Sequence, residues 1–179
     1  LTALCSIVFI ISFAQGQTQF DRGLTEFNQE NYEEALPYFL EARSAEKSAR
    51  IAYYVGLTYK IMEKYKEAVP YFEEAATLSP RVDEAIAELI DVLYHTNEIK
   101  EAEKWIAVSG KEGISSARLE LLKGLVLAKT GKPDEAIAAF EKAKKLDPGL
   151  TQQAELQIAG ILARQGKFKD AQARLRTTI

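Results

Sequence analysis

The sequence predicts an all-α protein built from repeated pairs of helices, and three observations lead to that prediction. Residues 64–75 (KYKEAVPYFEEA) repeat residues 31–42 (NYEEALPYFLEA), with eight of twelve positions identical. A short mark of small and large apolar residues then recurs along the chain at a steady step. Between the marks, apolar residues follow the i, i+3, i+4 spacing of a helix face rather than the alternation of a strand.

The recurring mark is an alanine followed by a large apolar residue four positions later and a small residue after three more. The alanines step by 33, 34, 34 and 35 residues, a period typical of helix-turn-helix repeats. Three copies are complete and two are weaker. The complete copies are Ala35-Phe39-Ala42, Ala68-Phe72-Ala75 and Ala136-Phe140-Ala143, and the weaker copies are Ala102-Ile106-Ser109 and Ala171-Leu175-Thr178.

The first fourteen residues, LTALCSIVFIISFA, carry no charge and precede a polar Gln-Gly-Gln. This run is shorter than the roughly 20 apolar residues that span a membrane. It ends with small residues where a signal peptidase cleaves, so we interpret residues 1–14 as a truncated secretory signal. An uncleaved N-terminal anchor is the alternative. Leu4 precedes Cys5 where a lipoprotein would have a small residue, which argues against lipidation. Cleavage after Ala14 would leave a chain without cysteine and without thiol chemistry.

After the signal, each unit is expected to contain two helices joined by a tight turn. Asn97, Gly131 and Gly166 suit the left-handed conformation that closes a first helix. Pro133 suits the first turn of the helix that follows, and Leu78-Ser79-Pro80 and Leu146-Asp147-Pro148 end units because proline resists continuing a helix. The predicted units cover residues 16–48, 49–82, 83–116, 117–150 and 151–179.

Two glycines inside the expected first helices have a packing explanation. Glycine costs roughly 1 kcal/mol against alanine within a helix. Gly56 and Gly124 each precede a repeat alanine by twelve residues, so we expect them to let paired helices approach closely beside the Phe side chains. Pro37 and Pro70 lie near the start of their helices and predict a slight local kink.

On these residues the sequence resembles the tetratricopeptide repeat family. The resemblance covers essentially everything after the signal, although residues 83–116 are degenerate because Ile90 replaces the small residue and Ile106 the aromatic one. It implies a right-handed superhelical solenoid whose first helices line a concave groove for a peptide or partner protein. The signature residues are Gly56, Tyr59, Ala68, Phe72, Ala75 and Pro80, and then Gly124, Ala136, Phe140, Ala143 and Pro148.

Helical spacing from the core stripe predicts which residues would line that groove. The expected surface is an apolar floor flanked by charges of both signs. The clamp with which some family members grip a C-terminal carboxylate is absent, because its positions hold Tyr53, Leu57, Ala87 and Glu88. The predicted groove residues are Arg50, Tyr53, Leu57, Lys60, Asp91, Tyr94, Arg118, Leu121, Leu125 and Lys129, and the last first helix would add Gln153, Gln157 and Arg164.

Charge argues against several classes of partner. The net charge is −3, so the sequence predicts neither the basic face that nucleic acid requires nor a polybasic patch for anionic lipid. Membrane contact is expected only through the signal segment or through a C-terminal part beyond this sequence.

The sequence offers no recognisable catalytic or cofactor motif. His95 is the single histidine, so a histidine metal site is not expected, and we expect a surface role at a helix end. No phosphate-binding loop or dinucleotide fingerprint occurs. The pairs Glu33-Glu34 and Glu73-Glu74 are adjacent, so they point in different directions and do not form an acid/base couple. Trp105 is expected to be packed, and we expect no cofactor, no metal and no enzymatic activity.

Two functional hypotheses follow. The first is an exported, non-catalytic adaptor in the periplasm or cell envelope of a bacterium. The second is that these residues are the N-terminal repeat module of a larger outer-membrane or peptidoglycan-associated protein. An enzyme acting through the groove is the least favoured reading.

Overall fold

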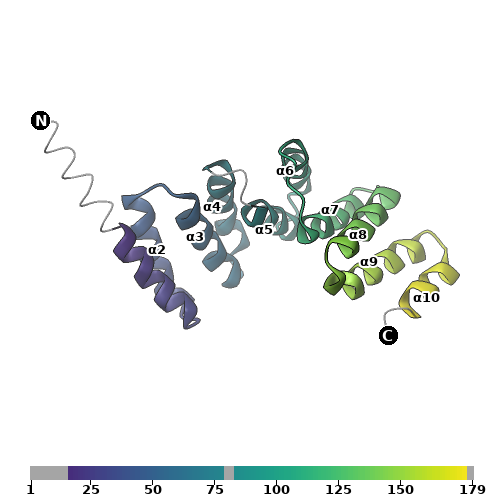
Figure 1. The fold of residues 1–179 in the computed structure, drawn as a ribbon, viewed down its shortest axis with the longest axis horizontal. Helices are drawn as coiled ribbons and strands as arrows, with labels where there is room; N and C mark the ends of the chain where they lie inside the picture. Colours follow the sequence, from purple (N-terminus) through teal and green to yellow (C-terminus); the bar gives the residue numbers. More distant parts are fainter. Residues whose placement is uncertain (1–15, 79–82, 177–179) are drawn as a thin grey trace, which may run out of the picture. The chain divides into compact units, whose positions relative to one another are not determined.

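The computed structural model describes residues 16–78 and 83–176. The signal segment predicted for residues 1–14, the unit-ending Pro80 and Thr178 of the last mark lie outside the described residues. The described part is helical throughout its regular structure (Figure 1). After a helix that covers residues 16–28, the helices are α2 (Tyr32–Ala45), α3 (Ala49–Ile61), α4 (Tyr65–Leu78), α5 (Asp83–His95), α6 (Ile99–Lys111), α7 (Ala117–Lys129), α8 (Pro133–Leu146), the short 3₁₀ helix η1 (Pro148–Leu150), α9 (Thr151–Arg164) and α10 (Phe168–Arg176).

Several helices that follow one another in the chain pack side by side. The most extensive contacts join α3 to α4, α7 to α8, and α9 to α10, while α2 with α3 and α8 with α9 join one pair to the next (Figure 1). These pairings confirm the predicted fold class, an all-α solenoid of helix-turn-helix repeats. The contacts divide the chain into two compact units, unit 1 ending at Val92 and unit 2 beginning at Leu93, inside α5. Each unit is described by itself below.

The turns between paired helices share one geometry. Asn97, Gly131 and Gly166 have φ of 64°, 76° and 76°, which confirms the predicted left-handed residues. In each turn the residue that follows donates its N–H to a carbonyl five positions earlier, as Glu98 does to Leu93 at 2.8 Å and Lys132 to Leu127 at 3.0 Å. This is the hydrogen bond that closes a helix with a left-handed residue.

Two further turns use glutamate in the same place. Glu30 and Glu63 have φ of 64° and 59°, although a left-handed side chain costs roughly 1–2 kcal/mol. The same closing bonds form after them, from Asn31 to Glu26 at 3.0 Å and from Lys64 to Tyr59 at 2.9 Å. The sequence analysis did not predict these positions, because the packing of the helix pair determines the turn even where the residue type disfavours it.

In both units a glycine of the first helix faces a phenylalanine ring of the second. A Cβ added to Gly56 would lie 2.9 Å from the Phe72 ring, and one added to Gly124 would lie 2.6 Å from the Phe140 ring. Gly23 meets the Phe39 ring in the same way, at 2.6 Å. Because these approaches are shorter than ordinary contacts, the helices can come this close only where the side chain is absent.

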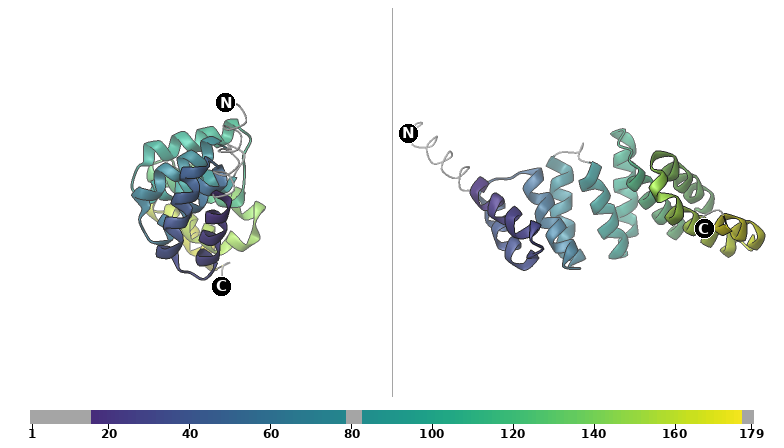
Figure 2. Two further views of the ribbon diagram at one scale, coloured as in Figure 1. Left: turned by 90° about the vertical axis from the view of Figure 1, so that its left-hand side faces the viewer. Right: turned by 60° about the horizontal axis from the view of Figure 1, so that its bottom comes forward.

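The core of unit 1 is aromatic. Phe39 is completely buried, and its ring lies 5.6 Å from the rings of Phe20 and Tyr54 and 6.1 Å from that of Phe27. The Tyr59 and Tyr71 rings stack at 5.5 Å. The helix of residues 16–28 packs beside α2 in this unit (Figure 2). The marks Ala35, Ala42, Ala68, Ala75 and Phe72 are all buried.

The core of unit 2 is aliphatic. Phe140 is completely buried and packs among leucine, isoleucine and alanine side chains of α7, α8 and α9, including Leu127 and Ile158. Ala136 and Ala143 have no exposed surface. In the weaker copy, Ile106 and Trp105 are both half-buried rather than fully packed.

Prolines lie at two kinds of position. Pro133 is the first residue of α8, as predicted. α8 ends at Leu146, and Pro148 begins η1, where the Asp147 carboxylate accepts a hydrogen bond from the Gly149 N–H at 2.8 Å. Pro37 and Pro70 lie inside α2 and α4, and a kink at these residues stays a prediction.

Candidate protein-binding surface

The predicted groove residues of unit 1 lie on α3 and α5. Arg50 is exposed and stacks over the Phe20 ring at 4.8 Å. Tyr53 is half-buried, with its ring edge-on to Phe72 at 5.9 Å. Leu57 is half-buried one turn further along α3. The α3 surface therefore combines anchored aromatic and apolar side chains with an arginine at its start.

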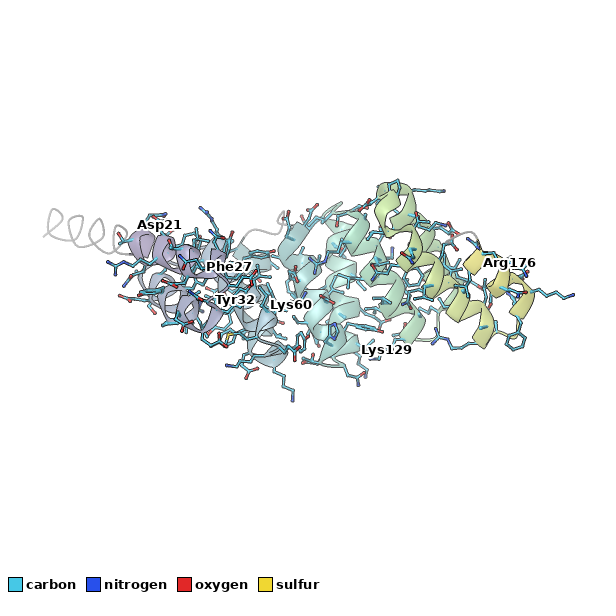
Figure 3. The ribbon with its side chains drawn as sticks, turned by 90° about the horizontal axis from the view of Figure 1, so that it is seen from below. Asp21, Phe27, Tyr32, Lys60, Lys129 and Arg176 are labelled. Carbon is cyan, nitrogen blue, oxygen red and sulfur yellow. The ribbon has the colours of Figure 1, made fainter. Side chains whose placement is uncertain are left out.

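Lys60 links the two first helices of unit 1. Its Nζ lies 2.5 Å from a carboxylate oxygen of Glu88 and is also ion-paired with Asp91, both on α5. The Glu88 side chain is only 5% exposed and that of Lys60 is 19% exposed, so the attraction is less screened than at an open surface. This ion pair holds α3 against α5, and Lys60 is labelled in Figure 3.

In unit 2 the predicted residues lie at the end of α5 and on α7. The Lys129 ammonium lies over the Tyr94 ring, 4.7 Å from its centre, and Lys129 is labelled in Figure 3. Arg118 and Lys129 are exposed and Leu125 is half-buried. Leu121 is a correction, because it is only 6% exposed and belongs to the core cluster to which α9 contributes Ala154. It is a core residue, not one available to a ligand.

Sequence analysis missed the most accessible apolar residue of the first helices. Leu156 of α9 is 59% exposed, and Gly160, one turn later, is exposed with no atom within 4 Å of a Cβ built on it. The last repeat alanine, Ala171, follows Ala136 by 35 residues. Adding 35 to the positions of Leu121 and Leu125 gives Leu156 and Gly160. The repeat period of the last unit could therefore have identified both residues.

The acidic residues of α7 and α9 are buried and paired within unit 2. Glu120, 5% exposed, accepts a hydrogen bond from Lys142 of α8 at 2.5 Å. Glu155, 4% exposed, is bonded to Lys144 of α8 and lies 3.2 Å from Arg174 of α10. These pairs were not predicted, because their partners come from other helices.

A second carboxylate completes the cluster at α8, α9 and α10. Glu141 accepts hydrogen bonds from Lys144 at 3.1 Å and from Arg174 at 2.6 Å. Burial would raise the pKa of Glu141, but these two hydrogen bonds outweigh it and hold the pKa below its ordinary value. For Lys144, burial would lower the pKa, but the hydrogen bonds to Glu155 and Glu141 outweigh burial and raise it. Glu141 and Lys144 are therefore charged at neutral pH, and the cluster joins three helices.

A pocket of about 210 Å³ lies beside α6 in unit 2. Its wall includes Ile106, Ser109 and Gly110 of α6, together with Glu120 and Lys142. Ile106 occupies the position that Phe72 and Phe140 occupy elsewhere, and Ser109 and Glu120 already form hydrogen bonds within the unit. The pocket is thus a consequence of the degenerate third repeat.

The described residues offer little for chemistry. No group of three potential metal-binding His, Cys, Asp or Glu side chains occurs among residues 16–78 and 83–176. His95 is exposed at the last position of α5. Glu33 and Glu34 lie in the first turn of α2. Glu73 and Glu74 lie half-buried in the second half of α4, where Glu74 binds Arg43 at 2.6 Å.

None of the helices in the described ranges combines the length and the apolar character needed to cross a bilayer.

Comparison with known families agrees with this architecture. One tetratricopeptide repeat model matches residues 61–123 and another matches residues 117–150, the span predicted for the fourth unit. Together they cover residues 61–150, half of the chain. The chain belongs to the tetratricopeptide repeat family. No curated protein matches its sequence.

Solved structures of tetratricopeptide repeat proteins share the fold. MamA (residues 41 to the end) from Desulfovibrio magneticus RS-1 superposes with a TM-score of 0.82 at 21% identity, covering 92% of this chain and 93% of that one. YrrB, described as having an unusual peptide-binding site, has a TM-score of 0.75 at 23% identity, with 90% and 83% covered. PilF of Pseudomonas aeruginosa has a TM-score of 0.73 at 17% identity, with 94% and 78% covered.

Proposed function

We propose that the chain is a non-catalytic scaffold that binds a peptide segment or a partner protein through the first helices of its repeats. The observation that carries the proposal is the chemistry of those helices. On α3, Tyr53 and Leu57 are half-buried on a helix that the Lys60 ion pairs hold against α5. Such a preorganised mixture of apolar and charged side chains loses little entropy when a partner binds.

Family membership supports this proposal. A single helix pair cannot bury its apolar face alone, so stacked pairs produce an extended surface as well as a core. YrrB, which shares the fold, is described as a repeat protein with a peptide-binding site. The extended surface of this chain is a suitable place for an equivalent role.

A crosslinking experiment with matched positions tests the proposal. A photoreactive amino acid is introduced at Leu57 of α3 or, as the control, at the exposed Thr77 of α4, and the protein is crosslinked in its native cells. We expect one defined adduct from position 57 and none from position 77. Leu57→Asp should abolish capture of the same partner by the otherwise unchanged chain. Equal adducts from both positions, or capture that survives Leu57→Asp, would contradict the proposal.

We also propose that the protein acts in a bacterial cell envelope. The support is the uncharged apolar run of residues 1–14, which has the composition of a secretory signal. Intact mass of the native protein after cell fractionation tests it. A periplasmic species that begins at Gln15 supports export, whereas a cytoplasmic species that retains residues 1–14 contradicts it. A much larger mass would favour the alternative of a repeat module within a larger envelope protein.

A further inference from the structure

The exposed charges of α7 and α9 have one sign. Arg118 and Lys129 of α7 and Arg164 of α9 are exposed, and Lys123 of α7 is half-buried. The two acidic residues of these helices are Glu120 and Glu155, which are buried and paired with cations of other helices. The negative charge of α7 and α9 is therefore compensated inside the unit, while the positive charge remains at the surface.

Apolar surface lies between these cations. Leu125 is half-buried on α7, and on α9 Leu156 is 59% exposed beside Gly160, where a Cβ would meet open space. On a helix, Leu156, Gly160 and Arg164 are four residues apart and share one face. Gly160 places no side chain next to this exposed leucine. We call the set Arg118, Leu125, Lys129, Leu156, Gly160 and Arg164 the α7–α9 surface.

In unit 1, the first helix α5 has the opposite character. α5 carries Asp83 and Glu84 in its first turn and Asp91 further along, and the cation Lys60 of α3 is already occupied by Glu88 and Asp91. Charge complementarity steers a partner and excludes wrong ones more than it adds affinity. An acidic partner is therefore repelled by α5 and attracted to the α7–α9 surface.

We propose that the α7–α9 surface binds an acidic peptide segment in which carboxylates flank one or two apolar side chains. An apolar side chain of the segment packs against Leu156 beside Gly160, and its carboxylates pair with Lys129 and Arg164. Nucleic acid fits less well, because it offers phosphates but no aliphatic group for Leu156, and few cations are present for counterion release. This inference rests on the proposed function and names the chemistry of the partner.

Selection from a displayed library of random peptides against the full chain tests the inference without a known ligand. We expect the recovered peptides to be enriched in Asp and Glu next to Leu, Ile or Phe. The best peptide is then labelled and its affinity measured by fluorescence anisotropy, beside a version with Gln and Asn in place of the acids. The neutral version should bind at least about tenfold more weakly, because charge-assisted hydrogen bonds are lost.

Charge-reversal variants locate the site. The double variant Lys129→Glu, Arg164→Glu should bind the acidic peptide about tenfold or more weakly than the unchanged chain does. The control is Lys111→Glu with Lys145→Glu, which makes the same change of charge in the last turns of the second helices α6 and α8. The control should leave the affinity within about twofold, since Lys111 and Lys145 are not part of the α7–α9 surface and dissolved ions screen charges that make no direct contact. Gly160→Leu, which fills open space, should weaken binding without any change of charge.

Four results would overturn the inference. The first is selection of neutral or basic peptides, and the second is an equal loss of affinity in the two charge-reversal variants. The third is full affinity in Gly160→Leu. The fourth is equally tight binding of an oligothymidylate that depends on Lys129 and Arg164. Peptide binding that is lost in Leu57→Asp but not in the Lys129 and Arg164 variant would refute this inference while leaving the proposed function intact. Recovery of no binding peptide, together with no crosslinked partner at position 57, would refute both.

Discussion

Unit 1 gathers aromatic rings around Phe39, whereas unit 2 surrounds Phe140 with aliphatic side chains. Buried carboxylates join helices in both units, through Glu88 in unit 1 and Glu155 in unit 2. Seven of the eight tyrosines lie at residues 32–71, and the Phe39 ring contacts three other aromatic rings. In unit 2, Phe140 packs among aliphatic residues, and Glu155 joins α8, α9 and α10. The same repeat geometry is thus stabilised by two chemistries, and each should fail under different perturbations.

Deleting the central ring of each unit should have the largest effect on the free energy of unfolding. Phe39→Ala and Phe140→Ala both remove a fully buried ring, which costs about 3–5 kcal/mol of unfolding free energy. Phe39 should cost more, because each aromatic pair adds about 0.5–1.5 kcal/mol beyond burial. Urea unfolding of both variants measures the difference. Equal losses would show that the aromatic contacts of unit 1 add nothing to ordinary packing.

Two glycine substitutions in unit 2 should give the next largest changes in stability, and the two changes should have opposite signs. Gly124→Ala places a Cβ 2.6 Å from the Phe140 ring, and such overpacking costs about 1–3 kcal/mol. Gly160→Ala meets no neighbour, so the helix propensity of alanine should stabilise the protein by about 0.5–1 kcal/mol. Thermal unfolding compares the two variants. If Gly124→Ala does not lower the thermal stability, then α7 and α8 can move apart without loss of stability.

Acid should weaken unit 2 through Glu141. Because the pKa of folded Glu141 is lowered from its ordinary 4.5, its stabilising contribution is present above that value and is lost as the pH falls through the folded pKa. The loss should stay below about 1 kcal/mol, since the pair is partly exposed. Fluorescence of Trp105, the only tryptophan, can follow unit 2 during urea unfolding at neutral and acidic pH. Glu141→Gln should reduce the loss of unfolding free energy at acidic pH. If the variant loses as much unfolding free energy as the unchanged protein, this carboxylate is not the source of the loss.

The surface ion pair of unit 1 should have the smallest effect. Arg43 lies 2.6 Å from Glu74 and 5.1 Å from the centre of the Tyr71 ring, and its side chain is 36% exposed. An exposed pair of this kind contributes about 0.2–1 kcal/mol. A double-mutant cycle of Arg43→Gln and Glu74→Gln isolates the pairwise energy. A coupling well above this range would show that partial exposure does not weaken this pair.

Local patterns were enough to predict most of the fold. Helix pairs follow from apolar spacing, and the left-handed Asn97, Gly131 and Gly166 follow from residue type. Glu30 and Glu63 could not be predicted in this way, because the residue type opposes the conformation that packing imposes. The boundaries assigned to the five units stay a prediction.

Less of the candidate surface could be predicted. The spacing placed Lys60 and Asp91 on first helices, but not their contact, which depends on the side-chain conformations of two helices. Leu121 was wrongly expected at the surface, since burial by α9 is a tertiary effect. Leu156 was missed because the sequence analysis named Gln157 instead, and a shift of one residue rotates a position on a helix by about 100°.

The packing of each helix on its neighbours in the chain also bears on how the protein folds. The ion pairs between helices join residues that are close in sequence, 31 apart for Arg43 and Glu74 and 33 apart for Glu141 and Arg174. Low contact order favours rapid folding, because little loop entropy is lost before a contact forms. A chain that emerges end-first from a ribosome or a translocation pore can therefore complete one layer before the next appears, with little apolar surface waiting for a distant partner.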